Sequence, residues 1–300
     1  MTSSPIKSGF VGVLGQANVG KSTLINSILG KKLLIVSEKR QSTRNRIRCI
    51  YNDPESQIIF MDTPGLHTPA DRLSKYLLRQ ALGGLEGLDL LLYMIEPWVR
   101  VKPYDANIFE NLKKSALRKI LVINKIDQAK ESELLETIHN YSLLNLFNEY
   151  IPISCKKGSN LDRLVWLIKE QLPEGPRYFP EDASLDRPES FIIAEFIREK
   201  VYQLTYEEIP YSVFVEVVEI KERNDKPLIE IYASIHVARE SQKGILVGSQ
   251  GAMIREIGLL ARKEIENLLG IQVYLELKVK VSEKWNESEL QIVKALGGPE

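Results

Sequence analysis

The residues with the clearest chemical potential form a glycine-rich loop near the start of the chain, Gly15-Gln16-Ala17-Asn18-Val19-Gly20-Lys21-Ser22, followed by Thr23. The loop comes directly after a predicted strand, Phe10–Leu14, and directly before a predicted helix with Ile25 and Leu29 on one face. In this context the backbone N–H groups of the loop and the helix N-terminus can bind phosphates. Lys21 can reach the β- and γ-phosphates of a nucleotide, and the Ser22 hydroxyl can hold Mg²⁺.

A second motif, Asp62-Thr63-Pro64-Gly65, directly follows the predicted strand Gln57–Met61. A carboxylate at this strand end can orient Mg²⁺ through water, and the N–H of Gly65 can meet the γ-phosphate. Taken alone, Asp-Thr-Pro-Gly is also a common turn, because proline and glycine favour the backbone angles that turns need. The phosphate-binding loop upstream is what makes the nucleotide interpretation the better one.

Two further motifs can recognise a base. Asn124-Lys125-Ile126-Asp127 ends one predicted strand, and Ser154-Cys155-Lys156 ends the next. The Asp127 carboxylate can accept hydrogen bonds from guanine N1–H and the guanine amino group, whereas adenine offers no donor there and would leave the carboxylate unpaired. A backbone N–H of the second motif can meet guanine O6. Guanine is therefore the predicted base.

The elements that must position these motifs alternate between apolar strands and helical patterns, which predicts an α/β fold with a mostly parallel sheet flanked by helices. The predicted strands are Phe10–Leu14, Gln57–Met61, Asp89–Ile95, Lys119–Ile123 and Tyr150–Ile153. A helix capped by Asn160 follows them and ends near Leu172. Each motif lies at the carboxyl end of a strand or directly after it, where open α/β sheets bind ligands. The set is the signature of a P-loop GTPase domain, since chance turns would need four coincidences.

The composition of the 300-residue chain predicts two domains and a reducing, cytosolic environment. Its two cysteines, Cys49 and Cys155, offer neither a disulfide framework nor the spacing of zinc ligands. We expect neither a signal peptide nor a segment of the roughly 20 apolar residues that cross a bilayer. The formal net charge is zero, and from Phe191 onward 14 Lys and Arg stand against 18 Asp and Glu. A nucleic acid would therefore have to bind at a local site of this second region.

A proline-rich segment from Pro173 to Pro188 predicts an extended linker between two domains. We place the first domain at residues 1–175, the linker at 176–189 and a second domain with a C-terminal extension at 190–300. The second domain has a predicted helix at 190–206, strands at 213–220, 228–237 and 271–281, and helices on both sides of Gly248-Ser249-Gln250-Gly251. This order predicts an α+β unit. Leu290, Val293 and Leu296 predict a last helix on its sheet, ended by Gly297 and Gly298.

The whole chain resembles the Era GTPases of the TrmE-Era class. In the first domain the resemblance rests on the loop residue Asn18, on Leu66 after Asp-Thr-Pro-Gly, and on Gln41-Ser42-Thr43-Arg44, where the family usually has threonine in place of Ser42. It continues through the second domain in "IREKV", "EIPYSV" and "LELKVKV". The resemblance implies that Thr43 completes the Mg²⁺ shell together with Ser22 and Asp62, and that the second domain is a type II K-homology (KH) domain.

The chain lacks the glutamine that orients the attacking water in Ras-like enzymes, since Leu66 and His67 follow Gly65. Leu66 cannot orient water by hydrogen bonding, and His67 is either a base or a structural residue. Asn18 is either a polar spacer or a ligand of K⁺ beside the phosphates, and the resemblance favours the second. We expect slow GTP hydrolysis to GDP and phosphate, stimulated by K⁺, with Asn18, Lys21, Thr43 and Gly65 as the catalytic set.

The Gly248–Gly251 stretch alone fits either an ordinary turn or a nucleic-acid clamp, and the KH resemblance favours the clamp. Its two glycines would let phosphates approach the backbone, and the amides of the next helix would add partial positive charge. Ser249 and Gln250 are neutral where such loops commonly carry Lys or Arg. The cations must then come from Lys243, Arg255, Arg262, Lys263, Lys278 or Lys280, and the candidates to line an apolar groove are Ile245, Val247, Ile254 and Ile257.

The resemblance implies a monomeric GTP-dependent switch that binds the 3′ region of 16S ribosomal RNA, assists assembly of the 30S subunit and releases it after hydrolysis. It also implies a cytoplasmic protein that associates peripherally with the inner membrane. Two alternatives remain: a non-enzymatic RNA chaperone that merely holds GTP, and a TrmE-like tRNA-modification GTPase or a GTPase with two G domains. The single N-terminal GTPase domain followed by Gly-x-x-Gly argues against the second alternative.

Overall fold

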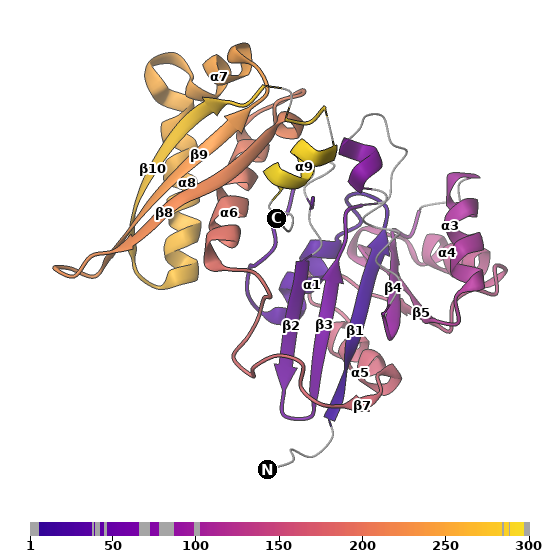
Figure 1. Cartoon of the computed structure of the whole chain (residues 1–300). Helices are drawn as coiled ribbons and strands as arrows, with labels where there is room; N and C mark the ends of the chain where they lie inside the picture. Colours follow the sequence, from indigo (N-terminus) through magenta and orange to yellow (C-terminus); the bar gives the residue numbers. More distant parts are fainter. Residues whose placement is uncertain are drawn as a thin grey trace. The chain divides into compact units, whose positions relative to one another are not determined.

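The computed structural model describes residues 6–37, 39, 43–44, 47–65, 73–77, 87–98, 103–283, 285–287 and 289–296 (Figure 1). The chain divides into two compact units. The first unit comprises Met1–Lys31, Thr43–Ala70 and Leu77–Asp186, and the second comprises Lys32–Ser42, Asp71–Tyr76 and Arg187–Glu300. A segment close to the start of the chain, 32–42, thus belongs to the same compact unit as the C-terminal half.

The first unit is built on a sheet with the strand order β2-β3-β1-β4-β5-β6, in which β7 also pairs with β1. The pairing is parallel except that β2 runs antiparallel to β3 and β7 antiparallel to β1. The strands are β1 (Ile6–Gly15), β2 (Ile47–Asp53), β3 (Ser56–Asp62), β4 (Leu90–Ile95), β5 (Arg118–Ile123), β6 (Glu149–Pro152) and β7 (Glu174–Gly175). The predicted fold class is confirmed, although β2 and β7 are absent from the sequence prediction.

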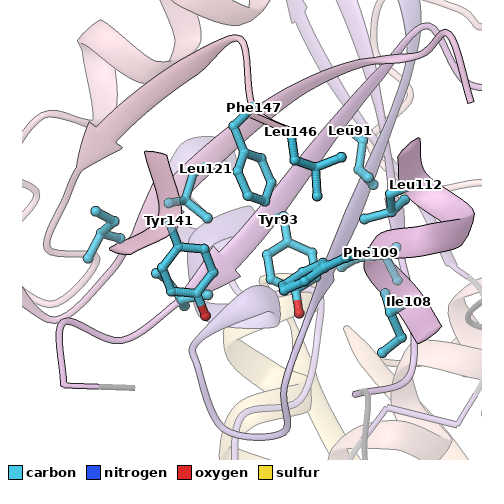
Figure 2. Close-up of a cluster of buried hydrophobic side chains, with 12 residues drawn as sticks. Leu91, Tyr93, Ile108, Phe109, Leu112, Leu121, Tyr141, Leu146 and Phe147 are labelled. Carbon is cyan, nitrogen blue, oxygen red and sulfur yellow. The ribbon is translucent and has the colours of Figure 1, made fainter. Parts of the chain in front are cut away.

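Helices cover the sheet of the first unit because its strands are apolar on both faces. Leu91, Tyr93 and Ile95 of β4 belong to one buried cluster, in which the Tyr93 and Phe109 rings pack edge to face at 5.4 Å (Figure 2). The alternate β4 residues Leu90, Leu92 and Met94 are equally buried. The helices of this unit are α1 (Lys21–Leu29), α3 (Pro103–Lys114), α4 (Glu131–Ser142) and α5 (Leu161–Gln171), with a short 3-10 turn at Ile126–Gln128.

Residues 173–186, which contain most of the predicted linker 176–189, are hydrogen-bonded to strands of the first unit. The Gln57 side chain accepts hydrogen bonds from the backbone N–H groups of Tyr178 at 2.7 Å and Phe179 at 3.0 Å. Further along, the N–H of Ile50 on the edge strand β2 donates to the Ser184 carbonyl at 2.9 Å. The first unit therefore extends to Asp186, and of the predicted linker only residues 187–189 belong to the second unit.

The second unit packs helices against a three-stranded sheet with the order β10-β9-β8. β9 is antiparallel to β8 and parallel to β10, with a register shift between Val217 and Glu219. One face of β9, formed by Ile231, Ala233 and Ile235, is fully buried. The elements are α6 (Glu189–Leu204), a 3-10 turn (Pro210–Ser212), β8 (Val213–Glu222), β9 (Leu228–Val237), α7 (Glu240–Val247), α8 (Ala252–Leu269), β10 (Gln272–Val281) and α9 (Glu289–Ala295). The predicted α+β order is confirmed.

The terminal helix α9 forms as predicted, but its buried face is not the predicted one. Ile292 is 1% exposed whereas Leu290 is 81% exposed, so the prediction is wrong for Leu290, while Val293 and Leu296 are half-buried. Trp285, ahead of α9, is buried and donates from its indole N–H to the Ser212 carbonyl at 3.0 Å. The expected terminators Gly297 and Gly298 lie outside the described residues. Within the part of the chain that the structure describes, no helix has the length and apolar character that a membrane span requires.

Candidate functional site

The phosphate-binding loop joins the end of β1 to the start of α1, and its glycines are required by close contacts. A Cβ atom on Gly20, where φ is 100°, would lie 2.4 Å from the Asn124 side-chain nitrogen. A Cβ on Gly15 would lie 2.4 Å from the Met94 carbonyl oxygen. Asn18 at the exposed crest has a φ of 66°, which asparagine tolerates better than most residues. The loop keeps this shape because larger residues cannot replace its glycines.

The Lys21 side chain turns back toward the loop that would surround the phosphates of a nucleotide. Its Nζ donates to the carbonyl oxygens of Gly15 at 3.2 Å and Gln16 at 3.0 Å, and the residue is 6% exposed. Burial lowers the pKa of Lys21 to about 8, although the Asp62 carboxylate opposes this effect. A buried ammonium group with carbonyl partners is suited to exchange them for phosphate oxygens, whose negative charge would raise its pKa again.

Ser22, Thr43 and Asp62 come together although they lie on α1, an intervening segment and β3. The Asp62 Oδ2 atom accepts from the Ser22 hydroxyl at 3.1 Å and from the Thr43 hydroxyl at 3.2 Å, and the two hydroxyl oxygens are 3.2 Å apart. Asp62 is fully buried, and burial raises its pKa to about 6. Its second oxygen, Oδ1, is buried without a hydrogen-bond partner among the described residues.

This donor set fits Mg²⁺. The ion prefers oxygen ligands, and a protein commonly supplies only one or two of them while phosphates and waters complete the octahedron. The orphaned Oδ1 of Asp62 and the two hydroxyls provide such a partial shell. Among the described residues no group of three or more His, Cys, Asp or Glu side chains forms a metal cage, so the chain offers no competing metal centre there.

The remainder of the Asp62–Gly65 motif holds the end of β3 against the phosphate-binding loop. The Thr63 hydroxyl donates to the Val13 carbonyl of β1 at 2.7 Å. Gly65 lies so close to the loop that a Cβ atom there would be 2.9 Å from the Ala17 Cα. Gln41, Ser42, Leu66 and His67 lie outside the described residues.

Asn124 ties the base-recognition motif to the phosphate loop and to the last strand. Its side-chain nitrogen donates to the Val19 carbonyl at 2.8 Å, and its side-chain oxygen accepts the N–H of Cys155 at 3.0 Å. All three segments are therefore fixed by one buried amide. The Cys155 N–H is already used in this way, and the Ser154 N–H donates to the Ser159 carbonyl. Of the three predicted amides, only that of Lys156 has no partner among the described residues.

Asp127 is held for recognition by a neighbouring hydroxyl. Ser154 Oγ donates to Asp127 Oδ1 at 2.6 Å, and the hydrogen bond from Ser154 lowers the pKa of the exposed Asp127 carboxyl. Ser154 is itself oriented by the Lys157 N–H, which donates to its hydroxyl oxygen at 3.1 Å. The Asp127 carboxylate therefore stays ionised and exposed, where it can accept hydrogen bonds from a base.

Lys125, in the same motif, forms an ion pair with Glu96, a residue that the sequence did not single out.

The Gly248–Gly251 loop turns sharply between α7 and α8. Gly248 has φ 70° and ψ 176°, Gln250 has φ 50° and Gly251 has φ 77°. A Cβ on Gly248 would lie 2.8 Å from the Met253 Cβ, whereas a Cβ on Gly251 would meet nothing within 4 Å. The side chains of Ser249 and Gln250 are exposed. The loop therefore presents backbone and open space immediately before the N-terminus of an 18-residue helix.

Beside this loop a groove of about 470 Å³ runs between α8 and β10. Of the predicted residues, Gly251, Ile254, Arg255 and Arg262 line it, while Ile257 is buried in the core. Lys243 pairs with Glu240 at 3.2 Å and does not line the groove. Gly258, Leu259, Tyr274, Leu275, Glu276 and Leu277 complete the lining.

Leu259 and Tyr274 were missed by the sequence reasoning although both are large and exposed, at 59% and 48%. The signal for Leu259 was its spacing of four residues from Arg255, which places both on one face of the helix. For Tyr274 there was no comparable signal. It alternates with the apolar residues of its strand, so the sequence pattern places its side chain on the solvent-facing side, where an isolated tyrosine is ordinary.

Comparisons with known proteins agree with both halves of this description. A family model described as "50S ribosome-binding GTPase" matches residues 10–125, and a KH domain model matches residues 208–286. GTPase Era of Geotalea daltonii is 47% identical over 297 residues, covering 99% of both chains. GTPase Era of Thermotoga maritima is 47% identical over 294 residues, covering 97% of both.

Two solved structures cover 97% of the chain and 99% of their own. One is Era in complex with MgGDPNP and nucleotides 1506–1542 of 16S ribosomal RNA, with a TM-score of 0.91 and 41% identity. The other is an Aquifex aeolicus Era variant bound to GDP and AlF4⁻, with a TM-score of 0.92 and 40% identity. Because the similarity spans the GTPase motifs and the KH domain alike, the chain belongs to the Era family of GTPases.

Proposed function

We propose that this GTPase binds the 3′ region of 16S ribosomal RNA in its GTP-bound state, assists assembly of the 30S subunit and releases the RNA after hydrolysis. The observation that carries the proposal is the likeness, over 97% of this chain, to the Era complex with MgGDPNP and 16S nucleotides 1506–1542. The groove beside Gly251 supports it, since it combines an exposed backbone loop with Arg255 and Arg262.

In the proposed nucleotide site, residues 15–23 surround the phosphates and Lys21 pairs with the β- and γ-phosphates. Ser22, Thr43 and Asp62 hold Mg²⁺ directly or through water, and the bound ion neutralises charge on the phosphate oxygens. Asn124, Lys125 and Asp127 bind the guanine base, with Ser154 orienting Asp127. The Lys156 N–H donates to guanine O6, because the Ser154 and Cys155 amides have partners within the protein.

For hydrolysis, the proposed roles depend on positioning and charge rather than on a general base. The Gly65 N–H donates to the γ-phosphate, and the γ-phosphate and its Mg²⁺ stabilise Thr43 in its position beside Ser22 and Asp62. Asn18 supplies an oxygen to K⁺ beside the phosphates, where a fixed positive charge stabilises the transition state. The exposed position of Asn18 at the crest of the loop supports this role.

In the proposed RNA site, the neutral loop contributes backbone and space rather than charge. Gly248, Ser249, Gln250 and Gly251 let a phosphate approach the amides at the start of α8. Arg255 and Arg262 contribute positive charge at the groove, and Ile254, Leu259 and Tyr274 contact the bases. Lys243 takes a peripheral part at most, since it pairs with Glu240.

The experiment that tests this proposal is recovery of RNA from total RNA by the full-length protein loaded with GDPNP or with GDP, followed by sequencing. We expect enrichment of the 16S 3′ end with GDPNP and little with GDP. Equal recovery of unrelated RNAs in both states would contradict the proposal. Recovery of 16S RNA with GTP that remains intact in KCl would instead favour a non-enzymatic chaperone.

We further propose that the protein is a cytoplasmic monomer. We place the boundary between its GTPase domain and its RNA-binding domain between residues 175 and 190. Light scattering with and without nucleotide tests the monomer, and a stable dimer would contradict it. Peripheral association with the inner membrane stays a prediction, and flotation with vesicles of bacterial inner-membrane lipids tests it.

A further inference from the structure

The segment that leads from the phosphate-binding helix to Thr43 is held by the second unit, although in sequence it belongs to the GTPase motifs. Residues 32–42 follow α1 directly, yet they fall in the same compact unit as α6 and α8. The residue that follows this segment is Thr43 of the first unit, whose hydroxyl lies 3.2 Å from both the Ser22 hydroxyl and the Asp62 carboxylate. One short segment thus links the predicted Mg²⁺ ligands to the helices of the second unit.

Four charged side chains make this attachment, Lys32, Glu199, Lys200 and Glu264, and we call them the charge cluster. Lys32 Nζ lies 2.7 Å from Glu199 and 3.0 Å from Glu264. Lys200 Nζ lies 3.1 Å from Glu264 and 3.4 Å from Glu199. The two positive and two negative charges alternate, so that each lysine contacts both carboxylates.

Half of the charge cluster is buried, which restricts its geometry. The Glu199 and Lys200 side chains are 2% and 6% exposed, whereas those of Lys32 and Glu264 are 32% and 29% exposed. Burial alone would lower the pKa of Lys32, but its hydrogen bonds to Glu199 and Glu264 outweigh that effect and raise it. Lys32 also lies 5.4 Å from the Phe196 ring centre. A sheltered set of charges tolerates few arrangements, because each displaced partner leaves another charge unpaired.

Two more contacts fasten the rest of the segment to α6. The Val36 N–H donates to Glu199 at 3.3 Å. Lys39 donates to the carbonyls of Tyr202 and Thr205 at the end of α6, and its Nζ lies 4.8 Å from the Tyr206 ring centre. The second unit therefore holds the segment at three points, the last of them four residues before Thr43.

Helix α8 connects the charge cluster to the groove beside Gly251. Glu264 lies on α8, the helix whose residues Arg255 and Arg262 line that groove. A continuous helix moves as a rigid element, so a ligand that shifts α8 also shifts Glu264. Glu264 in turn contacts Lys32 at 3.0 Å, and Lys32 is the first residue of the segment 32–42 that precedes Thr43.

We propose that the charge cluster is the coupling element between the RNA groove and the nucleotide site: when it is formed, it favours the position of Thr43 beside Ser22 and Asp62. This inference rests on the proposed RNA function for one of its two consequences only. The first consequence needs no RNA: disrupting the cluster should weaken binding of GDPNP with Mg²⁺ relative to GDP. The second is that RNA should lose part of its effect on nucleotide affinity.

The test compares the full-length wild-type protein with Lys32→Met and Glu264→Gln, using fluorescent GDPNP and GDP and a synthetic RNA of the 16S 3′ end. Lys221→Met and Glu219→Gln are the matched controls. They remove the same charges from a surface pair, 2.9 Å apart, on β8 of the same unit. Glu264→Gln retains a hydrogen-bonding side chain, and unfolding curves establish that each variant is folded.

We expect both cluster variants to lose about fivefold or more of the GDPNP preference over GDP without RNA, while the controls stay within twofold of the wild type. The factor by which RNA alters GDPNP affinity should fall by a similar amount, and by reciprocity so should the effect of GDPNP on RNA affinity. A purely structural role would lower affinity for GDP and GDPNP equally.

Preferences equal to those of the controls, with or without RNA, would overturn the inference. If RNA has no effect on the wild type, the proposed RNA function fails, and the measurement without RNA still decides whether the charge cluster controls Thr43.

Discussion

The Ser154 hydroxyl donates a 2.6 Å hydrogen bond to the carboxylate of Asp127, across two loops that follow different strands. Asp127 sits on an exposed loop, so without this bond its side chain would be free to rotate away from a bound base. Ser154→Ala should therefore lower affinity for both GTP and GDP on the order of tenfold, because one hydrogen bond to a charged group is lost. Titration with fluorescent GDP measures the effect. A variant that binds both nucleotides as the wild type does would show that Asp127 is positioned by other contacts.

Thr43→Ala should weaken the binding of GDPNP more than the binding of GDP. Its hydroxyl lies at the predicted Mg²⁺ shell, 3.2 Å from Asp62, and the proposed role requires the γ-phosphate. We expect GDPNP affinity in Mg²⁺ to fall by roughly tenfold and GDP affinity to change little. Thr43→Ser, which keeps the hydroxyl, is the control. Equal losses for GDP and GDPNP would assign Thr43 a structural role.

Asn18 should govern the dependence on monovalent cations. The wild-type protein should hydrolyse GTP faster in KCl than in NaCl in single-turnover experiments, and Asn18→Ala should abolish most of that difference while binding GTP similarly. Because Asn18 adopts a φ of 66°, Asn18→Gly is the control that preserves the loop shape and removes the oxygen. Equal wild-type rates in the two salts would contradict the K⁺ proposal.

Gly251→Asp is a sharper test of the RNA loop than the same change at Gly248. The space next to Gly251 is open and aspartate tolerates a φ near 77°, whereas a side chain at Gly248 would collide with Met253. The new carboxylate should repel phosphate and lower RNA affinity by tenfold or more, with GTP hydrolysis unchanged. Gly251→Asn, which has the same shape without the charge, should retain most of the binding. If Asp and Asn variants bind RNA as tightly as the wild type, the loop does not contact phosphate.

His236 should make the second unit sensitive to acid. It stacks on Phe214 at 4.4 Å, contacts Ser282 at 2.8 Å, and has Glu216 at 3.2 Å. Burial lowers the pKa of His236 below its ordinary 6.5, Lys280 adds to the effect, and Glu216 opposes it. The folded protein then binds fewer protons than the unfolded chain, so the free energy of unfolding falls as the pH drops through about 6.5.

His236→Gln should remove this contribution. The difference in melting temperature between pH 7.5 and pH 5.5 should be smaller for the variant than for the wild type. An unchanged difference would mean that other groups cause the acid sensitivity.

The motifs and the strands that precede them could be predicted because central parallel strands are buried on both faces and appear as continuous apolar runs. β2 lacks this signal, since it is an edge strand ending in Asn52 and Asp53, and it was missed. Asn160 was predicted as a cap because asparagine favours that position. Asn160 does occupy the N-cap position of α5, but its side chain donates to the Pro152 carbonyl at 2.8 Å and makes no cap hydrogen bond.

Contacts between residues distant in sequence were beyond prediction. Proline content predicted a connecting segment after Leu172, but it gave no sign of the hydrogen bonds that the Tyr178 and Phe179 N–H groups donate to the Gln57 side chain. The charge cluster joins Lys32 to Glu199 and Glu264, residues whose sequence surroundings suggest only ordinary surface charges. At the nucleotide site, by contrast, most predicted side chains are near one another, because four strand ends meet at one edge of the sheet.

The central claim is that one guanine nucleotide site controls the RNA groove, and an equilibrium titration tests it most directly. A labelled RNA of the 16S 3′ end would be titrated with the full-length protein saturated with GDPNP and Mg²⁺, and separately with GDP and Mg²⁺, at one fixed salt concentration. The account predicts at least about fivefold tighter binding with GDPNP. Equal affinity in the two states would contradict it and leave a GTPase whose nucleotide does not control this groove.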